Sequence, residues 1–420
     1  MPDDKPASDE TILATLSQIT RQHGTPAYAY DQRRIRLQAE KLRTQLPESI
    51  ELFYSLKANA SLGICDILSD CGLGADVASA GELVTAMAAG FPPSRIFVAG
   101  PYKSPETVSL LHSLPEAIIS IDSPSELGML TCEDVRNPAV LRLRPDFDSS
   151  AVVTAGSDSR FGVPAEWLPD CKNILADGGI DVIGFHVFAG SQVLDAAEVV
   201  RHLHSAMELS LRTADTLGIE LEFVNLGGGF GTPYAANDEE LDLAPIAEEL
   251  ERLVQRAAPA RVALELGRYF VAQAGWYLTS VIGHQTHQGR PAVIVDGGTH
   301  QRADLCGIGL RCNAIPPVVL GASASPLSEK DVLGCLSLPA DVLAQSAQLP
   351  SLVTGDVLAF ANAGAYGLWS SPAMFHGSPL PTEIAFDGET IDVMRHPQPA
   401  SSILDAQNHV TQRASVTQTQ

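Results

Sequence analysis

The chain has 420 residues, of which 45% are hydrophobic and 18% are charged, so it can bury a large core and form two or three domains. Its formal net charge of −23 argues against binding to nucleic acids or to anionic membranes, because both partners favour a basic surface. The seven cysteines are scattered without metal-ligand spacing, the first residues are polar and acidic, and no apolar run approaches the roughly 20 residues that span a bilayer. These features predict a cytoplasmic protein with reduced cysteines and no bound metal.

The first 34 residues are expected to contribute a helix, over 9–23, and a strand, over 26–31, to a β-domain formed by the second half of the chain. From residue 35, short apolar runs alternate with segments of helical periodicity, which is typical of parallel strands connected by helices. The runs lie at 50–56, 74–79, 95–100, 117–122, 139–144, 182–188, 222–228 and 261–267. Eight such units within residues 35–270 predict an α/β fold, a closed (β/α)8 barrel.

The pattern changes after residue 270. Strand-like segments separated by turn residues occupy 276–285, 290–298, 331–338, 355–364 and 381–394. They predict a second, mostly β domain over residues 271–398, resembling a β-sandwich or barrel. Residues 399–420 are polar and poor in aromatic side chains, so we expect a disordered tail there.

Polar residues stand in or after several of the predicted barrel strands. Lys57 follows the first strand, and taken alone it could simply extend its amine to solvent. Because the carboxyl ends of barrel strands meet at one mouth, Lys57 is instead expected to lie near Asp76, His186, Glu265 and Arg268. The sequence therefore predicts an active site at this mouth.

A glycine-rich turn follows the seventh predicted strand. Gly227, Gly228 and Gly229 leave backbone N–H groups accessible to a phosphate, and the Arg268 guanidinium can pair with its oxygens. A lysine, a phosphate site and a carboxylate at one mouth fit pyridoxal 5′-phosphate. A lysine binds this cofactor as a Schiff base, and a carboxylate keeps its ring nitrogen protonated.

Seven motifs then make a family resemblance visible. They are FYSLKAN (53–59), GADVASAGEL (74–83), SRFG (159–162), GFHVFAGSQ (184–192), NLGGGFG (225–231), ELGR (265–268) and GDVLAFANAGAYG (355–367). In this order they resemble the ornithine/diaminopimelate/arginine decarboxylase family of pyridoxal-phosphate enzymes with the alanine-racemase fold. The resemblance covers about residues 25–390.

The resemblance implies roles for individual residues. Lys57 would form the Schiff base, Glu265 would face the pyridine nitrogen, and Asp76 and His186 would line the site near the cofactor. The cofactor phosphate would be held by Ser191, Gly228, Gly229, Gly267, Arg268 and Tyr366. The family's sites are completed across a homodimer interface, and here Tyr366 and the segment around residue 337 are expected to come from the partner subunit.

The sequence departs from the family pattern at three places. Phe188 stands where the better-known members have a histidine stacked on the cofactor ring, and it can stack without carrying charge. Leu266 replaces the usual proline of the strand-eight motif. The family's catalytic cysteine aligns with Ser337, while Cys335 lies two residues earlier, on the same face if this segment is a strand. Cys335 could also be only a small buried hydrophobic residue.

The residue after Ser337 bears on the substrate. Leu338 stands where ornithine and diaminopimelate enzymes need a carboxylate, so these free diamino acids and free lysine are poor candidates. Segments such as GFHVFAGSQ and AGAYG (363–367) most resemble enzymes that decarboxylate an aminoacyl group on an acyl-carrier protein, and an exosortase-associated relative.

We therefore predict a biosynthetic pyridoxal-phosphate decarboxylase acting on an L-amino acid or on a carrier-tethered aminoacyl group. Two alternatives stay open. An amino-acid racemase of the same fold could use Tyr366 as its second acid or base. A pyridoxal-phosphate-binding homeostasis protein would perform no catalysis, but such proteins resemble the barrel alone.

Overall fold

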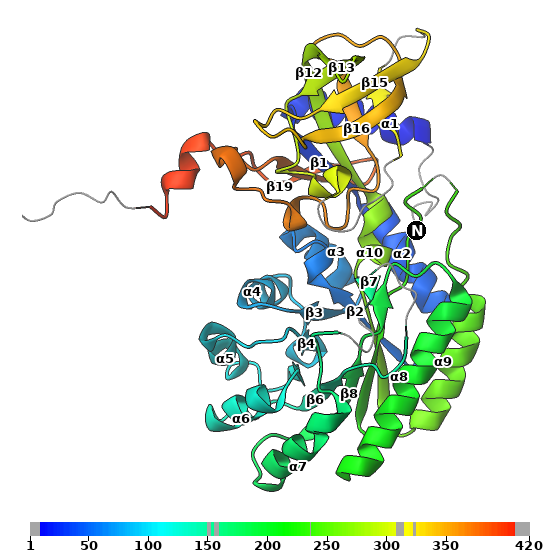
Figure 1. Cartoon of the computed structure of the whole chain (residues 1–420), viewed down its shortest axis with the longest axis vertical. Helices are drawn as coiled ribbons and strands as arrows, with labels where there is room; N and C mark the ends of the chain where they lie inside the picture. The colour runs from blue at the N-terminus through cyan, green and yellow to red at the C-terminus, as the bar shows by residue number, and fades with distance from the viewer. Residues whose placement is uncertain are drawn as a thin grey trace, which may run out of the picture.

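The computed structural model describes residues 9–148, 153–154, 159–235, 237–307, 315–321 and 325–407. Figure 1 shows a barrel surrounded by helices, with a second domain built mainly of strands beside one of its ends. No helix in the described ranges is both long enough and apolar enough to cross a membrane.

The barrel contains all eight strands that the sequence predicts. They close in the order β10-β11-β2-β3-β4-β5-β6-β8, and neighbouring strands are parallel. Their bounds are β2 (Ile50–Ser55), β3 (Gly74–Val77), β4 (Ile96–Val98), β5 (Ile118–Ile121), β6 (Ala139–Leu143), β8 (Val182–Val187), β10 (Phe223–Gly228) and β11 (Arg261–Leu266). A short pair, β7 (Val153–Thr154) and β9 (Gly190–Ser191), lies outside this sheet.

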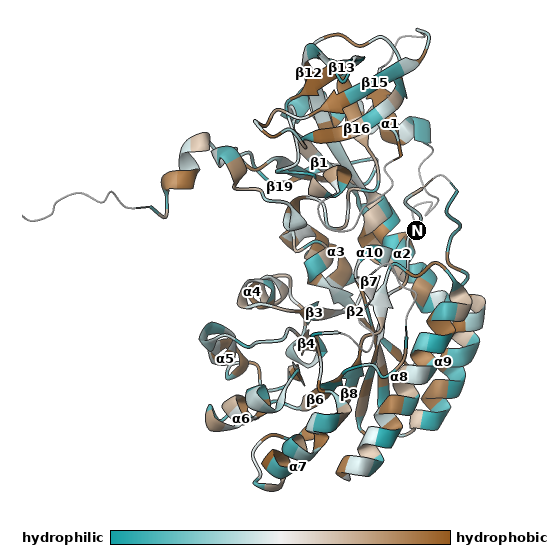
Figure 2. Ribbon diagram, in the orientation of Figure 1, coloured by the Kyte–Doolittle hydropathy of each residue, from teal (hydrophilic) through white to brown (hydrophobic). Residues whose placement is uncertain are grey.

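Helices connect the strands and cover the outside of the barrel. They are α2 (Gln32–Gln45), α3 (Leu62–Asp70), α4 (Ala80–Ala88), α5 (Pro105–Leu111), α6 (Pro124–Cys132), α7 (Leu168–Ala176), α8 (Ala196–Leu217), α9 (Ala244–Ala257) and α10 (Arg268–Val271). Ser79, Ser104 and Ser123 begin three of these helices, because each hydroxyl accepts a hydrogen bond from the N–H three residues on. In Figure 2, α8 and α9 carry alternating hydrophilic and hydrophobic stripes, as expected of helices that bury one face.

Aromatic side chains fill the inside of the barrel. Phe53, Phe97 and Phe223 are fully buried, and the centroid of the Phe97 ring lies 6.0 Å from that of Phe53 and 6.1 Å from that of Phe223. The same Phe97 ring meets His186 edge to face at 5.3 Å. This packed aromatic layer thus supports the His186 side chain at the mouth of the barrel.

The second domain is built on a nine-stranded sheet. Its strands are β1 (Ala27–Asp31), β12 (Gly275–His287), β13 (Arg290–Val295), β14 (Val318–Leu320), β15 (Ser328–Leu333), β16 (Val342–Leu349), β17 (Val357–Phe360), β18 (Thr382–Phe386) and β19 (Ile391–Arg395). The N-terminal strand β1 lies between β12 and β18. Helix α1 (Asp9–His23) buries Ile12, Leu16 and Ile19 in a cluster with β1 and its neighbours.

The segment 331–338 differs from its prediction as one strand. Strand β15 ends at Leu333, and residues 334–341 form a loop. Asp341 holds this loop, because its carboxylate accepts hydrogen bonds from Leu336 N and from the N–H and hydroxyl of Thr299. The argument that Cys335 and Ser337 share one face of a strand is therefore wrong.

The C-terminal segment extends away from the body of the molecule (Figure 1). Within the predicted tail, Ala400–Leu404 form a short 3-10 helix. Residues 408–420 of that tail lie outside the described residues.

Candidate active site

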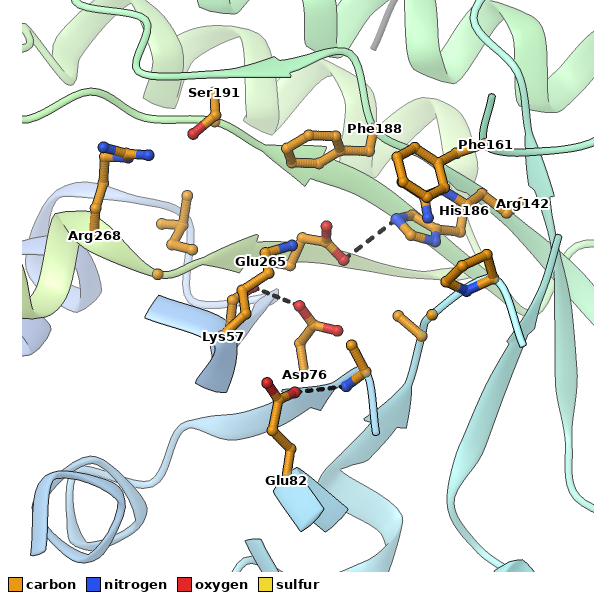
Figure 3. A pocket seen from close by; sticks show the side chains of 18 of the residues that line it. Lys57, Asp76, Glu82, Arg142, Phe161, His186, Phe188, Ser191, Glu265 and Arg268 are labelled. Atoms are coloured by element: carbon orange, nitrogen blue, oxygen red, sulfur yellow. Dashed lines mark hydrogen bonds and ion pairs between the residues drawn. The ribbon is translucent and has the colours of Figure 1, made fainter. Parts of the chain in front are cut away.

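A cavity of about 710 Å³ opens at the carboxyl ends of the barrel strands. Most of the predicted site residues line it, namely Lys57, Asp76, His186, Phe188, Ser191, Gly229, Glu265, Gly267, Arg268 and Tyr366. Figure 3 shows Arg268 and Ser191 at one end, Phe161, Arg142 and His186 at the other, and Lys57, Asp76 and Glu265 between them. Residues far apart in the sequence therefore meet at one mouth, as expected for side chains at the carboxyl ends of barrel strands.

Lys57 projects into this cavity from the short 3-10 helix Leu56–Ala58 that follows β2. The Lys57 side chain is accessible from the cavity. Protein nevertheless surrounds the amine, and the surrounding groups determine its pKa. Burial alone would lower the pKa of the amine. The carboxylates of Asp76 and Glu265 outweigh burial and raise it. The amine is thus directed at the site rather than at the outer surface.

Glu265 on β11 is oriented by Asn225 on the neighbouring strand β10 and by His186 on β8, the strand beyond it. His186 Nε2 lies 3.3 Å from Glu265 Oε2, and Asn225 Nδ2 donates a hydrogen bond of 3.3 Å to the same oxygen. Burial opposes ionisation of Glu265, but the contact with the His186 imidazole and then the charge of the Lys57 ammonium outweigh burial and lower the pKa of Glu265. Burial lowers the pKa of His186, so we take His186 as neutral and Glu265 as ionised. Oε1 has no hydrogen-bond partner among the described residues and can accept from a protonated ring nitrogen.

The opposite end of the cavity is suited to a phosphate. Gly227 and Gly229 have φ angles of +70° and +78°, and a Cβ at Gly229 would lie only 2.1 Å from the carbonyl oxygen of Gly190. Glycine is therefore required where the chain approaches the cavity. Arg268 is buried, and one of its guanidinium nitrogens, Nη2, is buried without a hydrogen-bond partner. A phosphate bound here would satisfy that donor.

Tyr366 lines the cavity of its own chain. Its ring centroid lies 4.8 Å from Arg268 Cζ, and its N–H donates to the carbonyl oxygen of Ala58 at 2.7 Å. Asn59 Nδ2 likewise donates to the carbonyl oxygen of Gly364. The loop after β17 thus contacts the segment that carries Lys57, and the expectation that Tyr366 comes from a partner subunit is wrong. That expectation rested on the shared sites of the resembling family and on the distance of Tyr366 from the barrel strands in the sequence, whereas here the second domain of the same chain brings Tyr366 to the cavity.

Cys335 and Ser337 do not line the cavity of their own chain. Both are exposed on the loop 334–341, and Cys335 Sγ makes one long contact, 3.5 Å, with the carbonyl oxygen of Asp296. The alternative that Cys335 is a small buried hydrophobic residue is therefore wrong.

Comparisons with known proteins agree with this geometry. Residues 32–272, more than half of the chain, match the family model described as "Pyridoxal-dependent decarboxylase, pyridoxal binding domain". The chain belongs to this family.

Three relatives extend the match over both domains. The L-glutamyl-[BtrI acyl-carrier protein] decarboxylase of Niallia circulans is 31% identical over 94% of this chain and 96% of its own length. The crystal structure of diaminopimelate decarboxylase from Helicobacter pylori, complexed with L-lysine, has a TM-score of 0.83, 25% identity, and covers 93% of this chain and 98% of that one. A mutant of SrLDC solved in complex with PLP has a TM-score of 0.79, 25% identity, and covers 92% and 97%.

The cofactor of the pyridoxal-dependent decarboxylases fits the residues present. The unpartnered Arg268 nitrogen and the glycine turn suit its phosphate, Oε1 of Glu265 suits its ring nitrogen, and Lys57 is the amine between them. When bound, pyridoxal 5′-phosphate supplies a ring that withdraws electrons from the substrate carbon that loses its carboxyl group. The chain is thus a pyridoxal-phosphate decarboxylase.

Several cavity residues received no role from the sequence. Arg142 on β6 and Arg160 in the SRFG motif both pack on the ring of Phe161, with their Cζ atoms 4.9 and 4.4 Å from its centroid. Glu82 also lines the cavity and accepts a hydrogen bond from Ala78 N. Two features of the sequence could have pointed to these arginines: Arg142 stands inside an apolar strand, and Arg160 belongs to the motif at 159–162.

Asp76 makes the stability of the cofactor-free protein depend on pH. Burial and then Glu265 raise its pKa to about 7, despite Lys57 and a hydrogen bond of 2.5 Å from Ser55 Oγ. Because the unfolded value is about 3.9, the native state binds more protons between those two pH values. The contribution of Asp76 to the free energy of unfolding is therefore fully present below pH ~4 and is lost as the pH rises towards 7.

Asp76→Asn should remove that dependence. Relative to wild type, the variant should gain up to about 4 kcal/mol of stability between pH 4 and pH 7.5. Thermal unfolding of the cofactor-free proteins across this range measures the difference. Asp177→Asn, at an exposed carboxyl group at the end of α7, is the control and should follow wild type. Parallel pH profiles for Asp76→Asn and wild type would contradict the assigned shift.

Proposed function

We propose that this enzyme removes the α-carboxyl group, as CO₂, from an aminoacyl group carried on an acyl-carrier protein. The side chain of that group would not end in an ammonium. The relative named above acts on an L-glutamyl group on a carrier protein, and we extend the carrier, but not the identity of the acyl group, to this chain.

One observation carries the proposal. The loop 334–341 contains a single acidic residue, Asp341, and that carboxylate is buried and already accepts three hydrogen bonds within its own domain. Leu338 stands beside Ser337, where a carboxylate would be needed to receive a substrate ammonium. A cation placed against this loop would lose its hydration without gaining a partner.

The proposal assigns each group at the site a task. Lys57 would hold the cofactor through its amine and is the group placed to return a proton to the substrate carbon. Glu265 would favour a protonated ring nitrogen through Oε1. Arg268, Ser191, Gly228, Gly229, Gly267 and Tyr366 hold the phosphate. Phe188, whose ring centroid lies 5.3 Å from Lys57 Nζ, would pack against the cofactor, and Asp76 and His186 complete the wall of the cavity.

We also propose a homodimer in which the loop 334–341 of each chain completes the site of the other. Cys335 and Ser337 are exposed and lie outside their own cavity, so any role in the reaction requires another chain to receive them. A two-fold axis lets both loops reach both cavities through one self-complementary contact.

Subunit complementation tests this arrangement. Lys57→Ala and a Cys335→Ala/Ser337→Ala double variant should each be inactive alone and should recover activity when mixed. Equal amounts make about half of the dimers mixed, each with one intact site, so about a quarter of wild-type activity is expected. Lys57→Ala mixed with Tyr366→Ala is the control. It should not recover, because Lys57 and Tyr366 serve the same cavity. Recovery in the control, or none in the first pair once native mass spectrometry shows exchange, would contradict the proposal.

The substrate is tested with a panel. Purified holoenzyme is given L-glutamyl and other aminoacyl groups on an acyl-carrier protein, together with free L-glutamate, L-ornithine, L-lysine and diaminopimelate, and the loss of CO₂ is followed by mass spectrometry. We expect kcat/KM to be highest for a carrier-bound group. Preference for a free diamino acid would reject the proposed substrate class, and inversion of the substrate without CO₂ loss would favour the racemase.

Finally, we propose a cytoplasmic location. The six cysteines within the described residues are all free, as expected in a reducing compartment.

A further inference from the structure

Behind His186, a series of polar contacts leads away from the cavity into the barrel wall. His186 Nδ1 lies 2.9 Å from Ser120 Oγ. Ser120 is on β5, is fully buried, and does not line the cavity. Its carbonyl oxygen accepts a hydrogen bond from Lys103 Nζ. Lys103 is itself completely buried and forms an ion pair of 3.3 Å with Glu126.

Part of this arrangement has a structural explanation. Lys103 also donates to the carbonyl oxygen of Gly100, and Glu126 accepts from Asp122 N near the start of α6. These contacts fasten the loop after β4 to β5 and α6. They also fix the main chain at Ser120, but they do not use its hydroxyl group, whose contact in the described structure is His186.

The two nitrogens of His186 have different neighbours. Nε2 lies 3.3 Å from Oε2 of Glu265, close enough for an attraction although the angle is poor for a hydrogen bond, and an ionised carboxylate can only accept a hydrogen bond. The contact is attractive only if Nε2 carries a proton. A neutral imidazole then has an acceptor at Nδ1, and the Ser120 hydroxyl is the group placed to donate to it.

We propose that Ser120 is a positioning residue that donates its hydroxyl proton to His186 Nδ1 and so keeps the imidazole in the Nε2–H form that faces Glu265. Lys103 holds the Ser120 main chain in place for this contact. The functional consequence rests on the proposed role of Glu265. If His186 changed tautomer, a lone pair would face Oε2, and Glu265 would hold the ring-nitrogen proton less firmly.

The tautomer can be observed without cofactor or substrate. Cofactor-free enzyme labelled with ¹⁵N-histidine is examined by NMR, and the signals lost in His186→Gln assign the ring. We expect wild type to show a protonated Nε2 and an unprotonated Nδ1. Ser120→Ala should move the Nδ1 signal and give a mixture of tautomers, whereas Ser120→Thr, which keeps the hydroxyl, should resemble wild type. Ser210→Ala removes another fully buried hydroxyl, on α8, and should change nothing at His186.

A protonated Nδ1 in wild type, or a Ser120→Ala spectrum identical to wild type, would overturn the proposal, and the wild-type measurement needs no variant to fold. Activity gives a second reading. Ser120→Ala should lower kcat about tenfold, the usual effect of a lost orienting contact, but should have no further effect in a His186→Gln background. Equal losses in both backgrounds would overturn the proposal. If the spectra behave as expected while no decarboxylation is found, the proposed function fails and the role of Ser120 stands.

Discussion

Lys57→Ala should abolish the covalent attachment of pyridoxal 5′-phosphate. Lys57 is the amine that projects into the cavity between the phosphate end and Glu265, and alanine has no nitrogen to bind the cofactor carbonyl. The long-wavelength absorbance of the bound cofactor should disappear, and borohydride should fix no pyridoxyl group to the chain. Turnover should fall to background.

Peptide mass spectrometry after reduction supplies the control for this experiment. In wild type the pyridoxyl mass should lie on the peptide that contains Lys57 and not on the peptide of Lys103, the buried lysine whose amine is engaged by Glu126 and two carbonyl oxygens. A reducible adduct that persists in Lys57→Ala would show that another lysine binds the cofactor.

Glu265→Gln should leave cofactor binding largely intact while turnover falls by about 10²–10³-fold, the usual cost of losing one well-placed electrostatic group. An amide cannot stabilise a proton on the ring nitrogen as a carboxylate does, so the ring withdraws electrons from the substrate less effectively. A titration of cofactor absorbance measures binding, and CO₂ release measures turnover.

Glu198→Gln is the matched control for Glu265→Gln. Glu198 is also a buried carboxylate, but it lies on α8 and pairs with His202 there, outside the cavity. It should change stability rather than the rate at saturating cofactor. Turnover of Glu265→Gln close to that of wild type would remove Glu265 from the role assigned to it.

The barrel was predictable because its strands are buried on both faces and read as unbroken apolar runs. The ends of these strands alone predict that Lys57, His186, Glu265 and Arg268 meet at one mouth. Strand β16 was missed because its sequence, VLAQSAQL, mixes apolar and polar residues without a clear alternation. The segment 334–338 reads as a continuation of the strand because Cys335, Leu336 and Leu338 are apolar, although Gly334 marks the point where β15 has ended.

The parts of the site that the sequence did not predict were hidden for a different reason. Ser120 lies in the apolar run AIISID (117–122), where a serine gives no sign that its hydroxyl faces a histidine. The chain that supplies Tyr366 depends on how β17 pairs with β12, and non-local pairing leaves no trace in local sequence pattern. Such roles depend on contacts between strands that are distant in sequence.

The junction between the Lys57 segment and the loop that carries Tyr366 limits how this enzyme could be recombined with its relatives. A fragment ending near residue 272 would lack Tyr366 and Gly364, which contact Ala58 and Asn59, and would leave those main-chain and side-chain partners open to water. The β-domain is also discontinuous, since β1 is inserted between β12 and β18. A chimera that exchanges this domain must therefore carry residues 9–31 together with the C-terminal half. It must also take residues 56–61 and 361–367 from the same parent, because these two segments contact each other. The active site can therefore be exchanged only together with the parts of both domains that build it.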